Sequence, residues 1–83
     1  MDQYLIMCRS LTRAQSSKAL LERNGFNASV TKAPQKLSQN GCGYAVSIYR
    51  RAEGAVALLR ERNMLSGKIY RRNDDGSYTE AAL

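Results

Sequence analysis

Histidine is absent from this chain of 83 residues, and cysteine and proline are scarce. Without histidine there can be no His-assisted nucleophile, no His metal ligand and no His pH switch. The two cysteines, Cys8 and Cys42, are far apart and form no Cys-x-x-Cys motif. That is too few for a zinc site or for the disulfide framework of a secreted domain. We therefore expect a reduced protein that needs neither a metal nor an organic cofactor.

Long hydrophobic runs are also missing. No apolar segment approaches the length of a membrane span, and no signal peptide is recognisable at the N-terminus. These absences predict a soluble, cytoplasmic protein with no membrane contact. The charge is 13 Lys and Arg against 7 Asp and Glu, so 13 − 7 gives +6. A basic balance permits contact with nucleic acid, a membrane surface or an acidic protein, and establishes none of them.

A chain of this length is expected to form one domain that buries about two-thirds of its unfolded surface. Hydrophobic periodicity predicts six elements: strand 3–8, helix 10–24, strand 26–31, strand 44–50, helix 52–63 and strand 68–72. The first strand is apolar on both faces, which is typical of the middle of a sheet. The strand at 26–31 alternates, which is typical of a half-buried edge strand. Either Ser10 or Thr12, the latter in a Thr-x-x-Gln capping box, can cap the first helix.

The order strand, helix, strand, strand, helix, strand favours an α+β ferredoxin-like sandwich, with antiparallel sheet order 4-1-3-2 and both helices on one face. After this domain, at residues 1–72, residues 73–83 form either a hairpin arm or a flexible tail, because 73–77 is a strong turn signal. Leu5 and Met7 make the second face of the first strand apolar as well. An apolar sheet face must be shielded from water, and self-association is the simplest way to shield it, so we expect a homodimer. The alternative is that the C-terminal arm folds over this face.

The most distinctive stretch surrounds Cys42, which stands between Gly41 and Gly43. Glycines allow tight backbone conformations and bring amide N–H groups close to the sulfur, where they can form an anion-binding nest. A thiolate is an anion and is the reactive form of cysteine. The functional interpretation is a presented, reactive thiol. The alternative is a small buried cysteine beside turn glycines.

The expected topology brings several of these residues to one end of the sheet. The end of the first strand, with Cys8, would lie beside the beginning of the third strand, which Cys42 precedes. The first helix would begin at the same end, and its N-terminus carries positive partial charge. Ser10, Thr12 and Arg13 would then be anion-stabilising neighbours of the thiol. Cys8 is interpreted either as a core residue or as a second thiol.

The chain resembles the selenium/sulfur carrier-like family of short bacterial proteins, long catalogued as a domain of unknown function. The resemblance covers about residues 3 to 72. It is carried by Tyr4-Leu5-Ile6, Ser10-Leu11-Thr12, Leu20-Leu21 before Gly25, Pro34 through Leu37-Ser38, Cys42-Gly43 and Gly67-Lys68-Ile69-Tyr70-Arg71. It implies that Cys42 accepts sulfur or selenium as a persulfide or selenopersulfide and passes it on, with donor and acceptor proteins as partners. On that reading the protein is a carrier and not an enzyme.

Two other hypotheses stay open at this stage. Cys8 and Cys42 could form a redox pair if their Cα atoms lie roughly 4.4–6.8 Å apart. The protein could instead be a partner-binding or nucleic-acid-binding module that uses the open sheet face, although nucleic acid is the less favoured partner. In that case the binding residues would be an aromatic side chain, Tyr44 or Tyr49, and the arginines Arg50, Arg51, Arg71 and Arg72.

Overall fold

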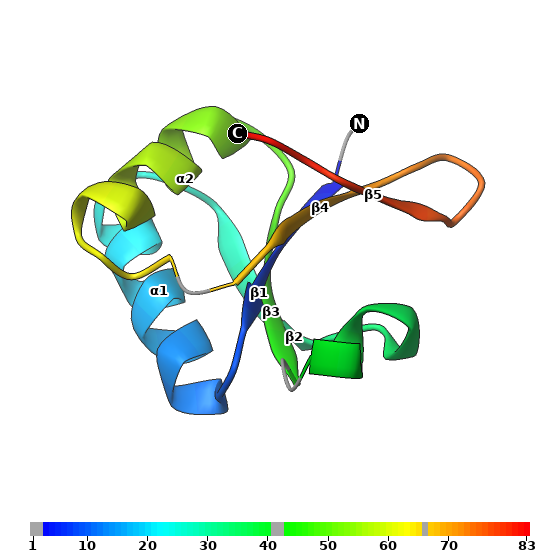
Figure 1. Ribbon diagram of the computed structural model, residues 1–83. Coiled ribbons are helices and arrows are strands. Elements are labelled where there is room, and N and C mark those ends of the chain that lie inside the picture. Colours follow the sequence, from blue (N-terminus) through cyan, green and yellow to red (C-terminus); the bar gives the residue numbers. More distant parts are fainter. Residues whose placement is uncertain (1–2, 41–42, 66) are drawn as a thin grey trace.

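The computed structural model describes residues 3–40, 43–65 and 67–83. These residues form a small α+β protein with five strands, two α-helices and one 3-10 helix. In chain order the elements are β1 (Gln3–Cys8), α1 (Leu11–Arg23), β2 (Ala28–Lys32), η1 (Gln35–Asn40), β3 (Tyr44–Ile48), α2 (Ala52–Glu61), β4 (Ile69–Arg72) and β5 (Tyr78–Glu80). The sheet separates the two α-helices, on one face, from η1 on the other (Figure 1).

The strands form one antiparallel sheet in the order β2-β3-β1-β4-β5. This differs in detail from the predicted four-stranded order 4-1-3-2, because β5 pairs with the outer side of β4 and extends the sheet. The chain therefore follows the hairpin alternative over residues 78–80. β1 and β3 occupy the middle, as expected for strands that are apolar on both faces. β2 lies at an edge, in agreement with its alternating pattern.

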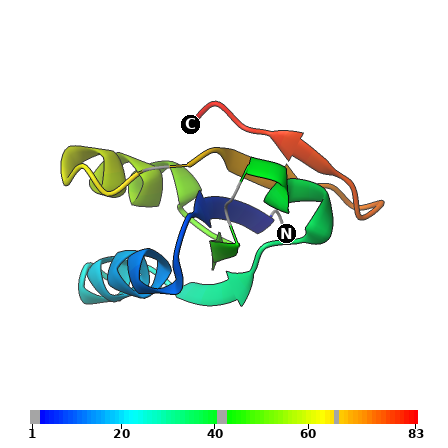
Figure 2. The ribbon, with the colours of Figure 1, turned by 60° about the horizontal axis from the view of Figure 1, so that its bottom comes forward.

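Both α-helices lie on the same face of the sheet (Figure 2), and each buries a narrow apolar stripe in the core beneath it. α1 buries Ala14, Ser17, Leu20 and Leu21, and α2 buries Ala52, Ala55, Val56 and Leu59. The stripes contain several small residues, which let the helices approach the strands closely. Gly25, with φ +85°, follows α1 at the position where the left-handed conformation ends a helix. The residues that repeat at helical spacing in the sequence thus form much of the main core.

The opposite face of the sheet is covered by the chain itself. Leu5, Met7 and Ala45 are buried there, and Leu37 of η1 and Tyr78 of β5 pack against them. Residues 35–40 belong to none of the six predicted elements, so η1 was not predicted. Because a single chain already buries this apolar face, the face gives no physical reason for self-association. The homodimer stays a prediction, but it is no longer supported by the need to cover the second face of β1.

Among the described residues, no helix is long and apolar enough to cross a membrane. The N-cap of α1 is Ser10 rather than Thr12, because the helix begins at Leu11 and Thr12 already lies in its first turn. Of the two predicted caps, the structure therefore selects the first.

Candidate functional site

The end of β1 and the beginning of β3 lie side by side at one end of the sheet. Cys8 and Tyr44 are Cα partners, and Tyr44 is also the partner of Lys32 at the end of β2. The backbone N–H of Ala33 donates to the carbonyl oxygen of Gly43 at 3.0 Å. The predicted meeting of the first and third strands is confirmed, and Gly43 stands at this end of the sheet.

The first α-helix begins at the same end, only two residues after Cys8. Ser10 has an extended backbone, with φ −140° and ψ 158°, and its Oγ accepts a hydrogen bond from the backbone N–H of Arg13 at 3.2 Å. Its carbonyl oxygen accepts from the N–H of Ala14 at 3.1 Å. These two bonds anchor the first turn and fix the direction in which the helix axis leaves β1 (Figure 1).

This helix terminus has a positive electrostatic character. The first turn of α1 contains no acidic residue, and Arg9, Thr12 and Arg13 are exposed around it. The N-terminal N–H groups of a helix carry positive partial charge, which a first-turn carboxylate commonly offsets. Here two guanidinium groups add to that charge instead. The arrangement favours an anion beside the start of α1, and Ser10 and Thr12 add hydroxyl groups that can donate hydrogen bonds.

The predicted carrier thiol, Cys42, and its neighbour Gly41 lie outside the described residues. Gly43, which follows Cys42 directly in the chain, is exposed. A Cβ built at Gly43 would meet no atom within 4 Å, and its φ is outside the left-handed region. The backbone and packing at residue 43 would therefore accept a side chain. If glycine is needed at this position, the reason is access to the neighbouring residue and not the fold.

Cys8 is a core residue in this structure. It is 2 % exposed, it belongs to the core cluster beneath the α-helices, and its Sγ donates to the carbonyl oxygen of Ile6 at 3.6 Å. This is the environment that the core interpretation predicted. The pairing of Cys8 with Cys42 is untested, because Cys42 is not described, and it stays a prediction.

The sequence analysis missed one residue that shapes this end of the sheet. Gly67 packs against the backbone of Met7, the residue before Cys8, so closely that an added Cβ would overlap the Met7 carbonyl oxygen. The Met7 N–H also donates to the carbonyl oxygen of Lys68 at 2.9 Å. The only signal in the sequence is a glycine just before the predicted strand 68–72, to which no packing role could be assigned. Its role is to let the chain before β4 lie directly against the end of β1.

No group of three or more His, Cys, Asp or Glu residues that could hold a metal ion occurs within residues 3–40, 43–65 and 67–83. The groups gathered around the start of α1 are therefore hydroxyls, guanidinium groups and backbone amides. Groups of these kinds can donate hydrogen bonds to an anion, and the anion-stabilising role of Ser10, Thr12 and Arg13 stays a prediction.

Comparison with known proteins identifies the family to which the chain belongs. Residues 3–71 match the family model described as Putative Se/S carrier protein-like. The match spans most of the chain, and the protein belongs to this family. No curated protein and no solved structure gives a significant match. The resemblance that the sequence analysis drew from its motifs is confirmed at the level of the family.

Proposed function

We propose that this protein carries sulfur or selenium on the thiol of Cys42 and delivers it to an acceptor protein. The family match over residues 3–71 is the observation that carries the proposal. On this proposal the protein acts in the cytoplasm as a carrier and does not itself catalyse a reaction. Its architecture is a ferredoxin-like sandwich that β5 extends at one edge.

The transfer step is an exchange at a sulfane sulfur. The Cys42 thiolate attacks the terminal sulfur of a donor persulfide, a new S–S bond forms, and the donor's S–S bond breaks. The donor sulfur leaves as a thiolate with the bonding electron pair. Delivery is the same reaction in the other direction: an acceptor nucleophile attacks the terminal sulfur, and Cys42 leaves as a thiolate. The two steps together need no external oxidant or reductant, and selenium can replace the terminal sulfur in both.

The described residues support this proposal through the character of the helix terminus. Both the thiolate and the terminal atom of a persulfide carry negative charge. Ser10, Thr12 and Arg13 surround the positive end of α1, and Gly43 stands at the end of the sheet where that helix begins. A thiolate near a helix N-terminus and cationic side chains is favoured over the thiol at neutral pH. On this proposal the amide N–H groups of Gly43 and of the first turn hold the charge during exchange.

The direct test is the intact mass of the protein after incubation with a cysteine desulfurase and free cysteine. We expect a gain of one sulfur atom that dithiothreitol reverses. Cys42→Ser should abolish the gain, whereas Cys8→Ala should keep it, because Cys8 is buried in the core. A second incubation with selenocysteine and a selenocysteine lyase tests whether selenium is accepted as well.

The alternatives predict different masses. A loss of two hydrogen atoms on oxidation that disappears in both single variants would identify a redox pair and overturn the carrier proposal. So would a Cys42 that takes up no sulfur and alkylates at the rate of an ordinary thiol. Arg13→Gln is the matched test of the anion-stabilising end: we expect slower alkylation of Cys42 at neutral pH, with Arg62→Gln as an exposed control on α2's C-terminal side.

A further inference from the structure

The other end of β3 presents an exposed aromatic side chain among arginines. Tyr49 follows the last residue of β3 and is 51 % exposed, which makes it one of two large hydrophobic side chains exposed on the described surface. Arg50 and Arg51 come next and are both exposed. The strand order places Arg72, at the end of β4, opposite Gln3 at the start of β1, so this arginine lies at the same end of the sheet.

Three hollows of the described surface share Tyr49 as a wall. The first, of about 200 Å³, lies between the Gly25–Asn27 segment and Tyr49, Arg50 and Arg51. A second, of about 370 Å³, adjoins Tyr4 and the start of α2. A third, of about 290 Å³, lies on the other side, between Tyr49, Gln3 and Arg72. Tyr49 thus borders all three hollows.

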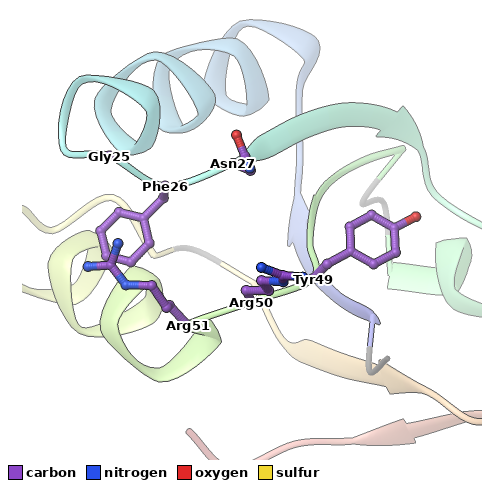
Figure 3. Close-up of a pocket in the computed structure, with 6 residues that line it drawn as sticks. All are labelled: Gly25, Phe26, Asn27, Tyr49, Arg50 and Arg51. Carbon is purple, nitrogen blue, oxygen red and sulfur yellow. The ribbon is translucent and has the colours of Figure 1, made fainter.

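The first hollow is basic, because its only ionisable side chains besides the phenol of Tyr49 are two arginines. Arg51 places its guanidinium over the Phe26 ring, 4.4 Å from the centroid (Figure 3). Stacking occupies the flat face of a guanidinium and leaves its N–H edge available to a phosphate. Among the described residues, neither Arg50 nor Arg51 has a carboxylate partner. Glu53 and Asp74 line the second and third hollows, so a phosphate is best accommodated in the first.

We propose that the end of β3, formed by Tyr49, Arg50, Arg51 and Arg72, binds single-stranded nucleic acid, with a base stacked on Tyr49 and a phosphate held by Arg50 and Arg51. An unpaired base needs an exposed aromatic face, which a duplex does not use, and Tyr49 offers one. Arg50 and Arg51 line one of these hollows and Arg72 lines another, so the arginines can follow a chain of phosphates, whereas a single free nucleotide would use only one hollow. The net charge of +6 favours the encounter.

This site differs from the binding mode considered in the sequence analysis. That mode placed the nucleic acid on the open sheet face, with Tyr44 or Tyr49 as the stacking residue. The face is covered by Leu37 and Tyr78, and Tyr44 packs against the core at the opposite end of β3. Of these two tyrosines, Tyr49 is the exposed one and is therefore the candidate for stacking on a ligand. Gly43 and Tyr49 are six residues apart on an extended strand, about 20 Å, so this surface is separate from the end of the sheet that contains Gly43.

The test is fluorescence anisotropy with a labelled oligouridylate of about 12 nucleotides, within the range of known single-strand site sizes. We would use Cys42→Ser protein, so that thiol chemistry cannot contribute and the result is independent of the carrier proposal. Tyr49→Leu should weaken binding about tenfold, and Tyr49→Phe should restore it, since stacking needs the ring and not the hydroxyl. Arg50→Gln and Arg72→Gln should each lower the slope of log K against log salt by about 0.7.

The matched control is Lys32→Gln, which removes the same charge from an exposed site at the far end of β2 and β3. It should leave the salt slope unchanged. Circular dichroism and thermal melting of each variant check that its fold is intact. The proposal is overturned if Tyr49→Leu binds as tightly as the parent, or if Lys32→Gln weakens binding as much as Arg50→Gln. It is also overturned if polyglutamate, duplex RNA or uridine monophosphate binds as tightly as the single strand.

Discussion

A single added methyl group at Gly67 tests how the chain before β4 is held against the end of β1. In Gly67→Ala the new Cβ would overlap the Met7 carbonyl oxygen and would lie 3.0 Å from both the carbonyl carbon and the Cβ of Met7. Met7 cannot easily move, because it is buried and its strand pairs with β3 on one side and β4 on the other. The contact must therefore be relieved by separating residues 67–68 from β1.

The expected change in the free energy of unfolding follows from three terms. Overpacking a well-filled site costs about 1–3 kcal/mol. Lengthening the hydrogen bond from the Met7 N–H to the Lys68 carbonyl oxygen adds about 0.5–1.5 kcal/mol. Replacing glycine also stiffens the unfolded chain, which returns about 0.4–1 kcal/mol. We therefore expect Gly67→Ala to lower the free energy of unfolding by about 0.5–4 kcal/mol, and the middle of this range, about 2 kcal/mol, lowers Tm by about 8–16 °C for a domain of this size.

Gly43→Ala is the matched control, because it makes the same change at an exposed glycine where the new Cβ meets nothing within 4 Å. We expect this variant to be as stable as the parent or up to about 1 kcal/mol more stable. Thermal melts and urea titrations followed by circular dichroism measure both variants, with an unchanged m value showing that the unfolded state is comparable. Equal Tm values for Gly67→Ala and Gly43→Ala would refute the close approach of residue 67 to β1.

Two further predictions concern local hydrogen bonds. Ser10→Ala removes the acceptor for the Arg13 N–H at the start of α1 and should cost about 1 kcal/mol in chemical denaturation, whereas Ser10→Asn should keep most of the stability. Asp75 accepts hydrogen bonds from the Oγ and the backbone N–H of Ser77, at 2.6 and 2.9 Å, and these lower the pKa of Asp75 from 3.8. Its contribution is therefore present above about pH 4 and is lost as pH falls through the lower folded-state pKa. The Tm difference between the parent and Asp75→Asn should shrink over that acidic interval, and a difference that grows there would contradict the assignment.

The sheet and the α-helices could be predicted because their residues repeat with the period of the element that they form. Leu5 and Met7 alternate with Ile6 and Cys8, and all four are apolar, so the sequence alone placed β1 in the middle of the sheet. Ala14, Ser17, Leu20 and Leu21 repeat at helical spacing and are the residues that α1 buries. The sequence was sufficient to predict these elements because the spacing of their apolar residues shows which face of each element is buried.

The 3-10 helix η1 could not be predicted in this way. Its residues are mostly polar and have no period, and its first hydrogen bond, from the Leu37 N–H to the Pro34 carbonyl oxygen at 2.8 Å, is that of a single turn. What distinguishes the segment is that Leu37 packs against Leu5 and Met7, which are about thirty positions earlier in the chain. A contact of that kind depends on the finished sheet. The same is true of Gly67, whose neighbour is sixty positions away.

The candidate site was predictable to the level of which strand ends meet, and no further. The meeting of the end of β1 with the beginning of β3 followed from strand order, whereas the register that pairs Cys8 with Tyr44 is known only from the structure. The sequence did not show whether residue 43 needs to be glycine. A glycine that a turn requires and a glycine that keeps a neighbouring residue accessible cannot be distinguished in a sequence. The structure shows that packing does not require glycine at this position.

The start of α2 explains why an arginine pair ended up beside Tyr49. No Ser, Thr, Asp or Asn precedes Ala52, and the N-cap is Arg51 in the left-handed conformation, with φ 57° and ψ 36° and no side-chain capping bond. A non-glycine residue in this conformation costs about 1 kcal/mol or more, and a conventional cap such as Asn would cost less. The stacking of Arg51 on Phe26 offsets part of that cost. Stacking on Phe26 accounts for the fixed orientation of Arg51, and the proposed phosphate-binding role accounts for a positive charge at a position that a conventional cap would fill. Arg51→Asn should therefore leave the protein at least as stable while weakening oligouridylate binding, and a variant that loses stability and keeps full binding would show that Arg51 serves the fold.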